Sequence, residues 1–160
     1  MNFGLEPVYN KESKILILGS FPGVKSREVK FYYGNPQNRF WKMLQDVFKI
    51  DFNVSSSKKI ENLHKLNIAL WDIVKNSNIK GSSDLNLIKN ITQNDINDID
   101  GLIAKTKIKK ILCNGRASYN LCCKYVKSDV KIVYVPSTSP ACVKFNQSKW
   151  EEELKNIWKN

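Results

Sequence analysis

The sequence predicts one domain over residues 1–160, a three-layer α/β/α sandwich with a short, mainly parallel central sheet. Short apolar runs alternate with amphipathic segments of helical spacing, a pattern that indicates strand–helix repeats. Two of these runs stop at a glycine and a third stops at a proline, as strands do where a parallel sheet meets its ligand crevice. A chain of 160 residues is long enough to bury a single core.

Four apolar runs are the expected strands, at 14–19, 68–74, 109–114 and 131–136. The first contains Ile15-Leu-Ile-Leu and ends at Gly19, and the third ends before Gly115. The last ends at Pro136, which has no backbone N–H to continue a ladder. Each strand therefore delivers the chain to a turn at its carboxyl end.

The helices are predicted from apolar residues that recur at helical spacing. The expected ranges are 37–48, 96–103, 116–125 and 150–158, with a further helix or turn from 55 in which Ser57 caps 60–66. Asn94 and Asp95 precede the second of these helices. The Asn/Ser/Gly-rich segment 76–86 is expected to be a long loop.

The composition is strongly basic. There are 26 Lys and Arg residues against 15 Asp and Glu, which gives a net charge of +11. Nucleic acid is the partner that such an excess serves most often, because neutralising phosphates supplies affinity independent of sequence. A proteome rich in lysine is the alternative explanation. The dispersal of the charge favours a folded basic face, made of Lys25, Arg27, Lys30, Arg39, Lys42, Lys109, Lys110, Lys144 and Lys149.

Other classes of protein find little support. No apolar run approaches the roughly 20 residues needed to span a bilayer, and the N-terminus lacks the features of a signal peptide, so a cytoplasmic location is expected. The four cysteines are then expected to be reduced. They lack the close pairs typical of metal sites, so no metal is predicted and they are interpreted as buried small side chains. His64, the single histidine, is interpreted as structural.

Three strand ends carry unusual residues: Gly19-Ser-Phe-Pro-Gly23, Asn114-Gly-Arg116 and Pro136-Ser-Thr-Ser-Pro-Ala141. Each alone is an ordinary turn, but parallel strands bring their carboxyl ends to one rim, where ligands bind. The segment Phe31-Tyr-Tyr-Gly-Asn-Pro-Gln-Asn-Arg-Phe-Trp41 adds aromatic, amide and guanidinium groups that suit a flat polar ring and a phosphodiester.

These motifs, with Leu70-Trp-Asp72 and Gly81-Ser-Ser-Asp84, occur in an order that resembles the hypoxanthine-DNA glycosylase (DNA-deoxyinosine glycosylase) branch of the uracil-DNA glycosylase superfamily. The resemblance covers nearly the whole chain. It implies a monomeric, monofunctional enzyme of base excision repair that flips a deaminated base, foremost hypoxanthine, and hydrolyses its N-glycosidic bond without a cofactor. Double-stranded DNA is the implied substrate, with single-stranded DNA as an alternative.

The resemblance also implies roles for individual residues. Mismatch-specific uracil/thymine glycosylases have an asparagine in the first motif where this chain has Ser20 and Phe21, so Asn38 is predicted to be the catalytic amide. Helix capping is its alternative role. The predicted base-binding residues are Gly19, Ser20, Phe21, Tyr33 and Asn114. Core packing is the alternative for Tyr33, and an ordinary turn is the alternative for Asn114.

The predicted DNA contacts are Pro22, Gly23, Arg39, Ser137, Thr138, Ser139, Pro140, Ala141 and Lys144, with the backbone amides of 137–139 gripping phosphates. Ala141, Cys142 or Val143 is expected to enter the base stack as a wedge. Trp71 and Asp72 are interpreted as architectural. Two alternative functions remain open: a uracil or mismatch-specific uracil/thymine glycosylase, and a non-catalytic nucleic-acid-binding α/β domain.

Overall fold

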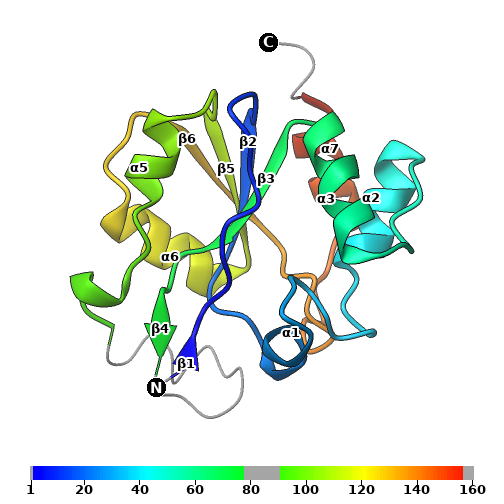
Figure 1. Cartoon of the computed structure of the whole chain (residues 1–160), viewed down its shortest axis with the longest axis horizontal. Helices are drawn as coiled ribbons and strands as arrows, with labels where there is room; N and C mark the ends of the chain where they lie inside the picture. Colours follow the sequence, from blue (N-terminus) through cyan, green and yellow to red (C-terminus); the bar gives the residue numbers. More distant parts are fainter. Residues whose placement is uncertain (1, 78–90, 157–160) are drawn as a thin grey trace.

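The computed structural model describes residues 2–77 and 91–156 (Figure 1). Its centre is a four-stranded sheet in the order β3-β2-β5-β6, and all neighbouring strands are parallel. The strands are β2 (Ile15–Gly19), β3 (Ile68–Asp72), β5 (Lys110–Asn114) and β6 (Lys131–Val135). The four predicted strands and the predicted fold class are therefore confirmed, with β3 two residues shorter than expected.

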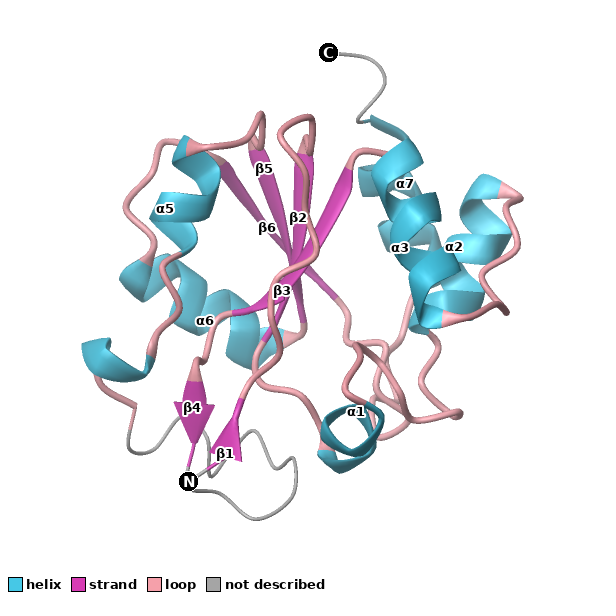
Figure 2. Ribbon diagram, viewed as in Figure 1, coloured by secondary structure: helices cyan, strands magenta, loops and turns pink. Residues whose placement is uncertain are grey.

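Helices cover both faces of the sheet (Figure 2). They are α1 (Val24–Val29), α2 (Phe40–Phe48), α3 (Ser56–Lys65), α5 (Ile99–Ala104), α6 (Arg116–Tyr125) and α7 (Gln147–Lys155). A 3-10 turn, η1, spans Gln93–Asp95, and a short antiparallel pair joins β1 (Asn2–Phe3) to β4 (Asn76–Ser77). None of the described helices is long and apolar enough to cross a membrane.

Strand β2 lies in the middle of the core because it is apolar on both faces. Ile15 and Ile17 belong to a cluster with side chains of α2, α3 and α7, whereas Leu16 and Leu18 belong to a second cluster with α5 and α6. Alternate residues of a strand point to opposite faces, so a run without polar residues needs helices on both sides. The three-layer arrangement follows from this run.

Several element boundaries differ from the prediction because local side-chain hydrogen bonds decide them. The helix expected from residue 37 begins at Phe40. Before it, Asn35 Oδ1 accepts from the Gln37 N–H at 2.9 Å, which holds a turn. Ser57 is not the cap of α3. Ser55 is, because its Oγ accepts from the Lys58 N–H at 3.3 Å.

The helix expected from Ile96 begins later. Asp98 caps α5 through the Gly101 N–H, and Ile96 instead pairs with Val74 in an isolated bridge. Helix α7 begins at Gln147, three residues before the predicted start. Helix α1 was not predicted, since its six residues show no apolar periodicity. The expected loop 76–86 begins with β4, and the rest of that range lies outside the described residues.

Two expectations from composition need correction. Lys109 and Lys110 lie where β5 begins, at the opposite edge from its carboxyl end, and Lys110 Nζ forms a largely buried ion pair with Glu153 at 2.6 Å. They are not part of one basic face with α1. Cys113 and Cys122 are buried as expected, but Cys123 is exposed and Cys142 is half-buried.

Candidate functional site

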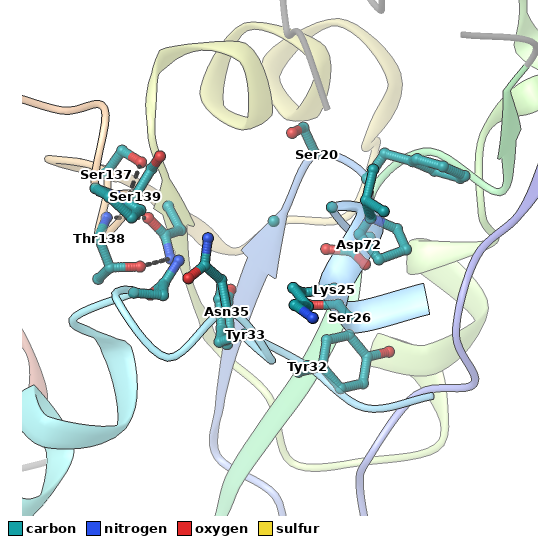
Figure 3. A pocket seen from close by; sticks show the side chains of 18 residues that line it. Ser20, Lys25, Ser26, Tyr32, Tyr33, Asn35, Asp72, Ser137, Thr138 and Ser139 are labelled. Atoms are coloured by element: carbon teal, nitrogen blue, oxygen red, sulfur yellow. Dashed lines mark hydrogen bonds between the residues drawn. The ribbon is translucent and has the colours of Figure 1, made fainter. Parts of the chain in front are cut away.

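A cavity of about 270 Å³ lies beyond the carboxyl ends of β2, β3 and β5 (Figure 3). Gly19 at the end of β2, Asn114 at the end of β5 and Ser137 after β6 all line it. The predicted convergence of the three strand ends on one rim is therefore found. Figure 3 shows Ser137, Thr138 and Ser139 on one side of the cavity and Asp72 on the other, with Tyr33 and Asn35 between them.

Most predicted site residues share this cavity. Its lining includes the predicted base-binding and catalytic positions and part of the predicted DNA contacts, namely Gly19, Ser20, Phe21, Pro22, Gly23, Tyr33, Asn38, Asn114, Ser137, Thr138, Ser139 and Pro140. Arg39, Ala141 and Lys144 are not among its lining residues. These three residues can contact DNA only from the protein surface outside the cavity.

The side chain of Asn114 is held by Thr138. Its Oδ1 accepts from the Thr138 N–H at 3.0 Å, and its Nδ2 donates to Thr138 Oγ1 at 3.1 Å. Because a backbone N–H can only donate, the oxygen must face Thr138 and the amide has one orientation. Asn114 therefore keeps a single N–H beyond its bonds to Thr138, and this amide also interacts with the Tyr33 hydroxyl, whose pKa it lowers.

Backbone N–H groups of the loop 136–142 donate hydrogen bonds to side chains of the protein. The Ser139 N–H donates to Ser137 Oγ at 3.1 Å, and the Ala141 N–H donates to Ser139 Oγ at 3.2 Å. The Thr138 N–H is taken by Asn114. The N–H groups of Thr138 and Ser139 are therefore already used within the protein, and a phosphate contact by these amides stays a prediction. The hydroxyls of Ser137 and Ser139 can still donate to phosphate oxygens, since they act as acceptors in these bonds.

Arg39 fastens this loop to the start of α2. Its backbone N–H donates to the Thr138 carbonyl at 3.1 Å, and both terminal nitrogens donate to the Cys142 carbonyl at 3.2 and 3.1 Å. The guanidinium also lies 4.9 Å from the centroid of the Phe145 ring. At the tip of the fastened loop, Val143 is 95% exposed. Of the three predicted wedge candidates, Val143 is thus the large apolar side chain that faces solvent.

Asn38 lies at the cavity, in the turn just before α2, and its catalytic role stays a prediction. It lines the cavity, and its Oδ1 accepts from the Phe40 N–H at 3.0 Å at the start of α2. The hydrogen bond fixes the direction of the carbonyl oxygen, which retains a second lone pair. The N-cap of α2 is Arg39, without a side-chain cap bond, so the bond from the Phe40 N–H holds a turn that precedes the helix.

Tyr33 is held on one side and open toward the cavity. Its ring stacks on Phe40 with centroids 4.0 Å apart and an interplanar angle of 25°, so only the other ring face is left for a ligand. Its hydroxyl is buried. Burial, and after it the charge of Asp72, raises the pKa of Tyr33 well above its ordinary value, although a hydrogen bond with Asn114 lowers it. The hydroxyl therefore stays protonated. Tyr32 is structural, since its hydroxyl donates to the Glu6 carbonyl at 2.7 Å.

Six lining residues were not predicted as site residues: Val24, Lys25, Ser26, Tyr32, Asn35 and Asp72. Asp72 is the most consequential, because it is 4% exposed and was interpreted as architectural. It ends β3 and pairs in register with Gly19. A signal was present in the sequence, since a carboxylate that directly follows an apolar parallel strand lies at the same edge as the other strand ends.

A small polar cavity at the carboxyl edge of a parallel sheet, walled by an aromatic ring and fixed amides, defines an α/β protein that accepts a flat, hydrogen-bonding ring. The family model of the uracil DNA glycosylase superfamily matches residues 6–160. The chain therefore belongs to the uracil DNA glycosylase superfamily, as its motifs suggested.

Relatives and a solved structure agree with this assignment. The chain is 32% identical over 155 residues to a hypoxanthine DNA glycosylase of Methanosarcina acetivorans, covering 92% of this chain and 94% of that protein. It is 30% identical over 156 residues to the hypoxanthine DNA glycosylase of Methanosarcina barkeri, covering 95% and 97%. A solution NMR structure from M. acetivorans, provisionally assigned to the uracil DNA glycosylases, superposes with a TM-score of 0.83 at 30% identity and covers 98% of both chains.

Proposed function

We propose that this protein is a DNA glycosylase that excises hypoxanthine from DNA and acts as a monomer. The observation that carries the proposal is the cavity itself, where a half-open tyrosine ring, an oriented Asn114 amide and Asn38 line one space of about 270 Å³. That volume lies below the range of drug-sized sites and suits a single base. The two Methanosarcina relatives named hypoxanthine DNA glycosylases support the choice of base.

Contacts with the phosphate backbone come from the cationic residues beside the cavity. Lys25 on α1 lines the rim of the cavity, whereas Arg27 and Lys30, on or next to the same helix, line a separate hollow beside residues 3–8. Together with a net charge of +11, they supply the sequence-independent attraction that offsets the cost of unstacking a base, a few kcal/mol. Val143, exposed at the tip of the loop held by Arg39, is placed to fill the gap that the flipped base leaves.

In the proposed reaction, Asn38 orients the attacking water. Its Oδ1 is aimed by the bond from the Phe40 N–H, and the second lone pair accepts a hydrogen bond from water at the mouth of the cavity. The water oxygen bonds to C1′ as the N-glycosidic bond breaks, the bond's electron pair leaves with the base, and the water proton passes to solvent or to the departing base. Donors in the cavity, among them the remaining Asn114 N–H, stabilise the charge that develops on the base.

A hydrolytic reaction leaves an intact abasic site, so we infer that the enzyme has no lyase step. Lys25 is the amine to test, because it lines the cavity rim and pairs with Glu28 at 3.5 Å. An attacking lysine would form an imine with the opened sugar, which borohydride reduces to a stable cross-link. We expect no cross-link to inosine DNA. A cross-link that disappears in Lys25→Met would contradict the hydrolytic assignment.

The decisive experiment uses end-labelled duplexes that contain inosine, uracil or a G·T mispair, followed by alkaline cleavage of abasic sites. Cutting chiefly at inosine supports the proposal, and cutting chiefly at uracil or G·T supports the other glycosylase assignments. Retardation of DNA on a gel without any cutting would favour a non-catalytic binding domain and would overturn the proposed activity.

Substitution of Asn38 tests the catalytic role. Asn38→Ala should lower excision of hypoxanthine by about 100- to 1000-fold, with DNA affinity largely kept. Loss of the bond to Phe40 costs only about 1 kcal/mol of stability, which thermal unfolding will register. Asn38→Asp keeps both acceptor functions and should retain measurable activity. Asn120→Ala, an exposed position on α6, is the matched control. Wild-type turnover in Asn38→Ala would refute the assignment.

A further inference from the structure

A second hollow lies across the turn 35–38 from the cavity. Its volume is about 590 Å³, and its lining includes Asn35, Trp41, Lys42, Gln45, Phe52 and Lys59. Tyr33, Asn35 and Asn38 are among the residues that line both spaces, so the turn is the wall between them. In Figure 1 the first turns of α2 and α3 point toward the side of the molecule where α1 lies. This second space, the Lys59 hollow, is therefore at the same end of the molecule as the cavity.

Lys59 brings a half-buried cation without an anion to this hollow. Its Nζ lies 5.1 Å from the centroid of the Trp41 ring, and across the described parts of the chain it makes no ion pair. Burial lowers the pKa of Lys59 from its ordinary value. A partly desolvated charge is unfavourable unless it is paired, and an anion from outside the protein would pair it. Lys42 adds a second ammonium, held only by an exposed contact with Asp46 at 3.7 Å.

Two amides of the Lys59 hollow are oriented as donors. Gln45 Oε1 accepts from the Phe52 N–H at 3.0 Å, and Asn35 Oδ1 accepts from the Gln37 N–H at 2.9 Å. Because a backbone N–H can only donate, both amide oxygens are fixed, and the two NH₂ groups remain for a ligand. The lining residues that the structure describes include no carboxylate. The side chains of the hollow therefore offer mainly donors and positive charge.

The aromatic wall of the Lys59 hollow is already packed within the protein. The Trp41 ring stacks with Phe31 and with Phe52, each at a centroid distance of 5.7 Å, and its Nε1 donates to the Tyr32 carbonyl at 3.0 Å. A ligand in the hollow is therefore recognised by charge and hydrogen bonds rather than by stacking. A phosphate group, with several acceptor oxygens and a negative charge, has the matching chemistry.

We propose that the Lys59 hollow is a second DNA subsite, in which Lys59, Lys42 and the Gln45 amide hold a phosphate of the strand that carries the lesion. The inference rests on the proposed function in taking DNA as the substrate, because a strand that leaves the cavity across the turn 35–38 arrives at this hollow. Lys59 is the first DNA contact assigned to α3. A phosphate contact of this kind fixes the register of the strand and does not depend on the neighbouring base.

The salt dependence of binding tests the contact. Fluorescence anisotropy measures Kd between about 50 and 200 mM salt for a duplex that carries a tetrahydrofuran abasic-site analogue, which has no base to excise. Lys59→Met removes the charge but keeps an apolar stem against Trp41. It should weaken binding several-fold and reduce the slope of log K against log salt by about 1. Lys59→Arg should keep the wild-type slope. Gln45→Glu keeps the acceptor for the Phe52 N–H, places an anion in the hollow and should also weaken binding.

Lys11→Met is the matched control. It makes the same change in net charge at an exposed lysine that precedes β2, at the amino edge of the sheet, and should leave the slope close to the wild-type value. Circular dichroism checks that each variant is folded. If Lys59 only covers the Trp41 ring with its stem, Lys59→Met will bind DNA like the wild type. That result, or equal slopes in Lys59→Met and Lys11→Met, refutes the subsite.

Shortened duplexes show which DNA segment the hollow holds. Removal of nucleotides from the lesion strand, on its 5′ side or on its 3′ side, should weaken wild-type binding more on one side, and Lys59→Met should not respond to that removal. Equal responses of the two proteins to both truncations would overturn the assignment to this strand. Inorganic phosphate is the second probe. A saturable shift of the Trp41 indole N–H resonance with phosphate, combined with wild-type DNA affinity in Lys59→Met, would indicate a site for free anions and overturn the DNA subsite.

These readouts are independent of excision. A salt slope that depends on Lys59, in a protein that releases no hypoxanthine from inosine DNA, would support the subsite and overturn the glycosylase assignment alone. Excision of hypoxanthine with an unchanged slope in Lys59→Met would do the reverse.

Discussion

Replacement of Gly19 by alanine should inactivate the enzyme without unfolding it. The added methyl would overlap Asp72 Oδ1 and would lie 3.6 Å from the carboxyl carbon. Because Asp72 is only 4% exposed and pairs with Gly19 in the sheet, the carboxylate cannot move out to solvent and must shift within the cavity. A shift of about 1 Å in a positioning group can cost about a hundredfold in rate. We expect a loss of that order in the single-turnover excision of hypoxanthine.

The stability cost of Gly19→Ala should be modest. Overpacking costs roughly 1–3 kcal/mol, which corresponds to a decrease of about 2–12 °C in Tm for a chain of this size. The assay therefore runs at 25 °C with the fold checked by circular dichroism. Gly4→Ala is the matched control, since its methyl would lie 3.3 Å from the Lys75 carbonyl and away from Asp72. A folded Gly19→Ala protein with more than half of the wild-type rate would refute this reasoning.

Three further outcomes are expected. Val143→Ala removes about 1.6 kcal/mol of apolar burial in the base stack and should slow excision from duplex DNA about tenfold, while the rate on single-stranded inosine DNA stays unchanged; an equal loss on both substrates would contradict the wedge role. Arg39→Lys cannot keep both bonds to the Cys142 carbonyl and should weaken duplex binding several-fold, as fluorescence anisotropy will measure. Glu153→Gln should lower the free energy of unfolding by about 3 kcal/mol at pH 7 because it leaves Lys110 without its anion. Burial alone would raise the pKa of Glu153, but the hydrogen bond and charge of Lys110 outweigh it and hold that pKa below its ordinary value. The stabilisation is therefore present above the unfolded-state pKa, roughly 4.3, and is lost as pH falls through the lower folded-state pKa, so urea titrations of wild type and variant should converge as the pH is lowered through that value.

The sheet could be predicted because its strands are buried on both faces. Ile15 to Leu18 are apolar without interruption, and the glycine that follows them fixes the strand end. Short polar segments were harder, since side-chain hydrogen bonds decide them one residue at a time. Ser55 and Ser57 are chemically identical candidates for the cap of α3, and only the path of the chain makes Ser55 accept from the Lys58 N–H.

The positions of the site residues could be predicted better than their contacts. The rule that parallel strands gather their carboxyl ends placed Gly19, Asn114 and Ser137 together correctly. The sequence cannot indicate that Thr138 takes the acceptor of Asn114, because the two residues are 24 positions apart and meet only in the folded chain. The same applies to Asp72, whose importance depends on lying beside a glycine in the neighbouring strand.

The three hydrogen bonds from Arg39 to the loop 136–142 bear on how tightly a duplex can be held. A flexible loop loses conformational entropy when it is ordered against a ligand, at about 0.5–1.5 kcal/mol for each immobilised side chain. In this protein the loop loses that conformational entropy when the polypeptide folds, before nucleic acid binds. The protein can then bind damaged DNA with little change in its own conformation. The main conformational change on binding is in the DNA, where one nucleotide leaves the helix.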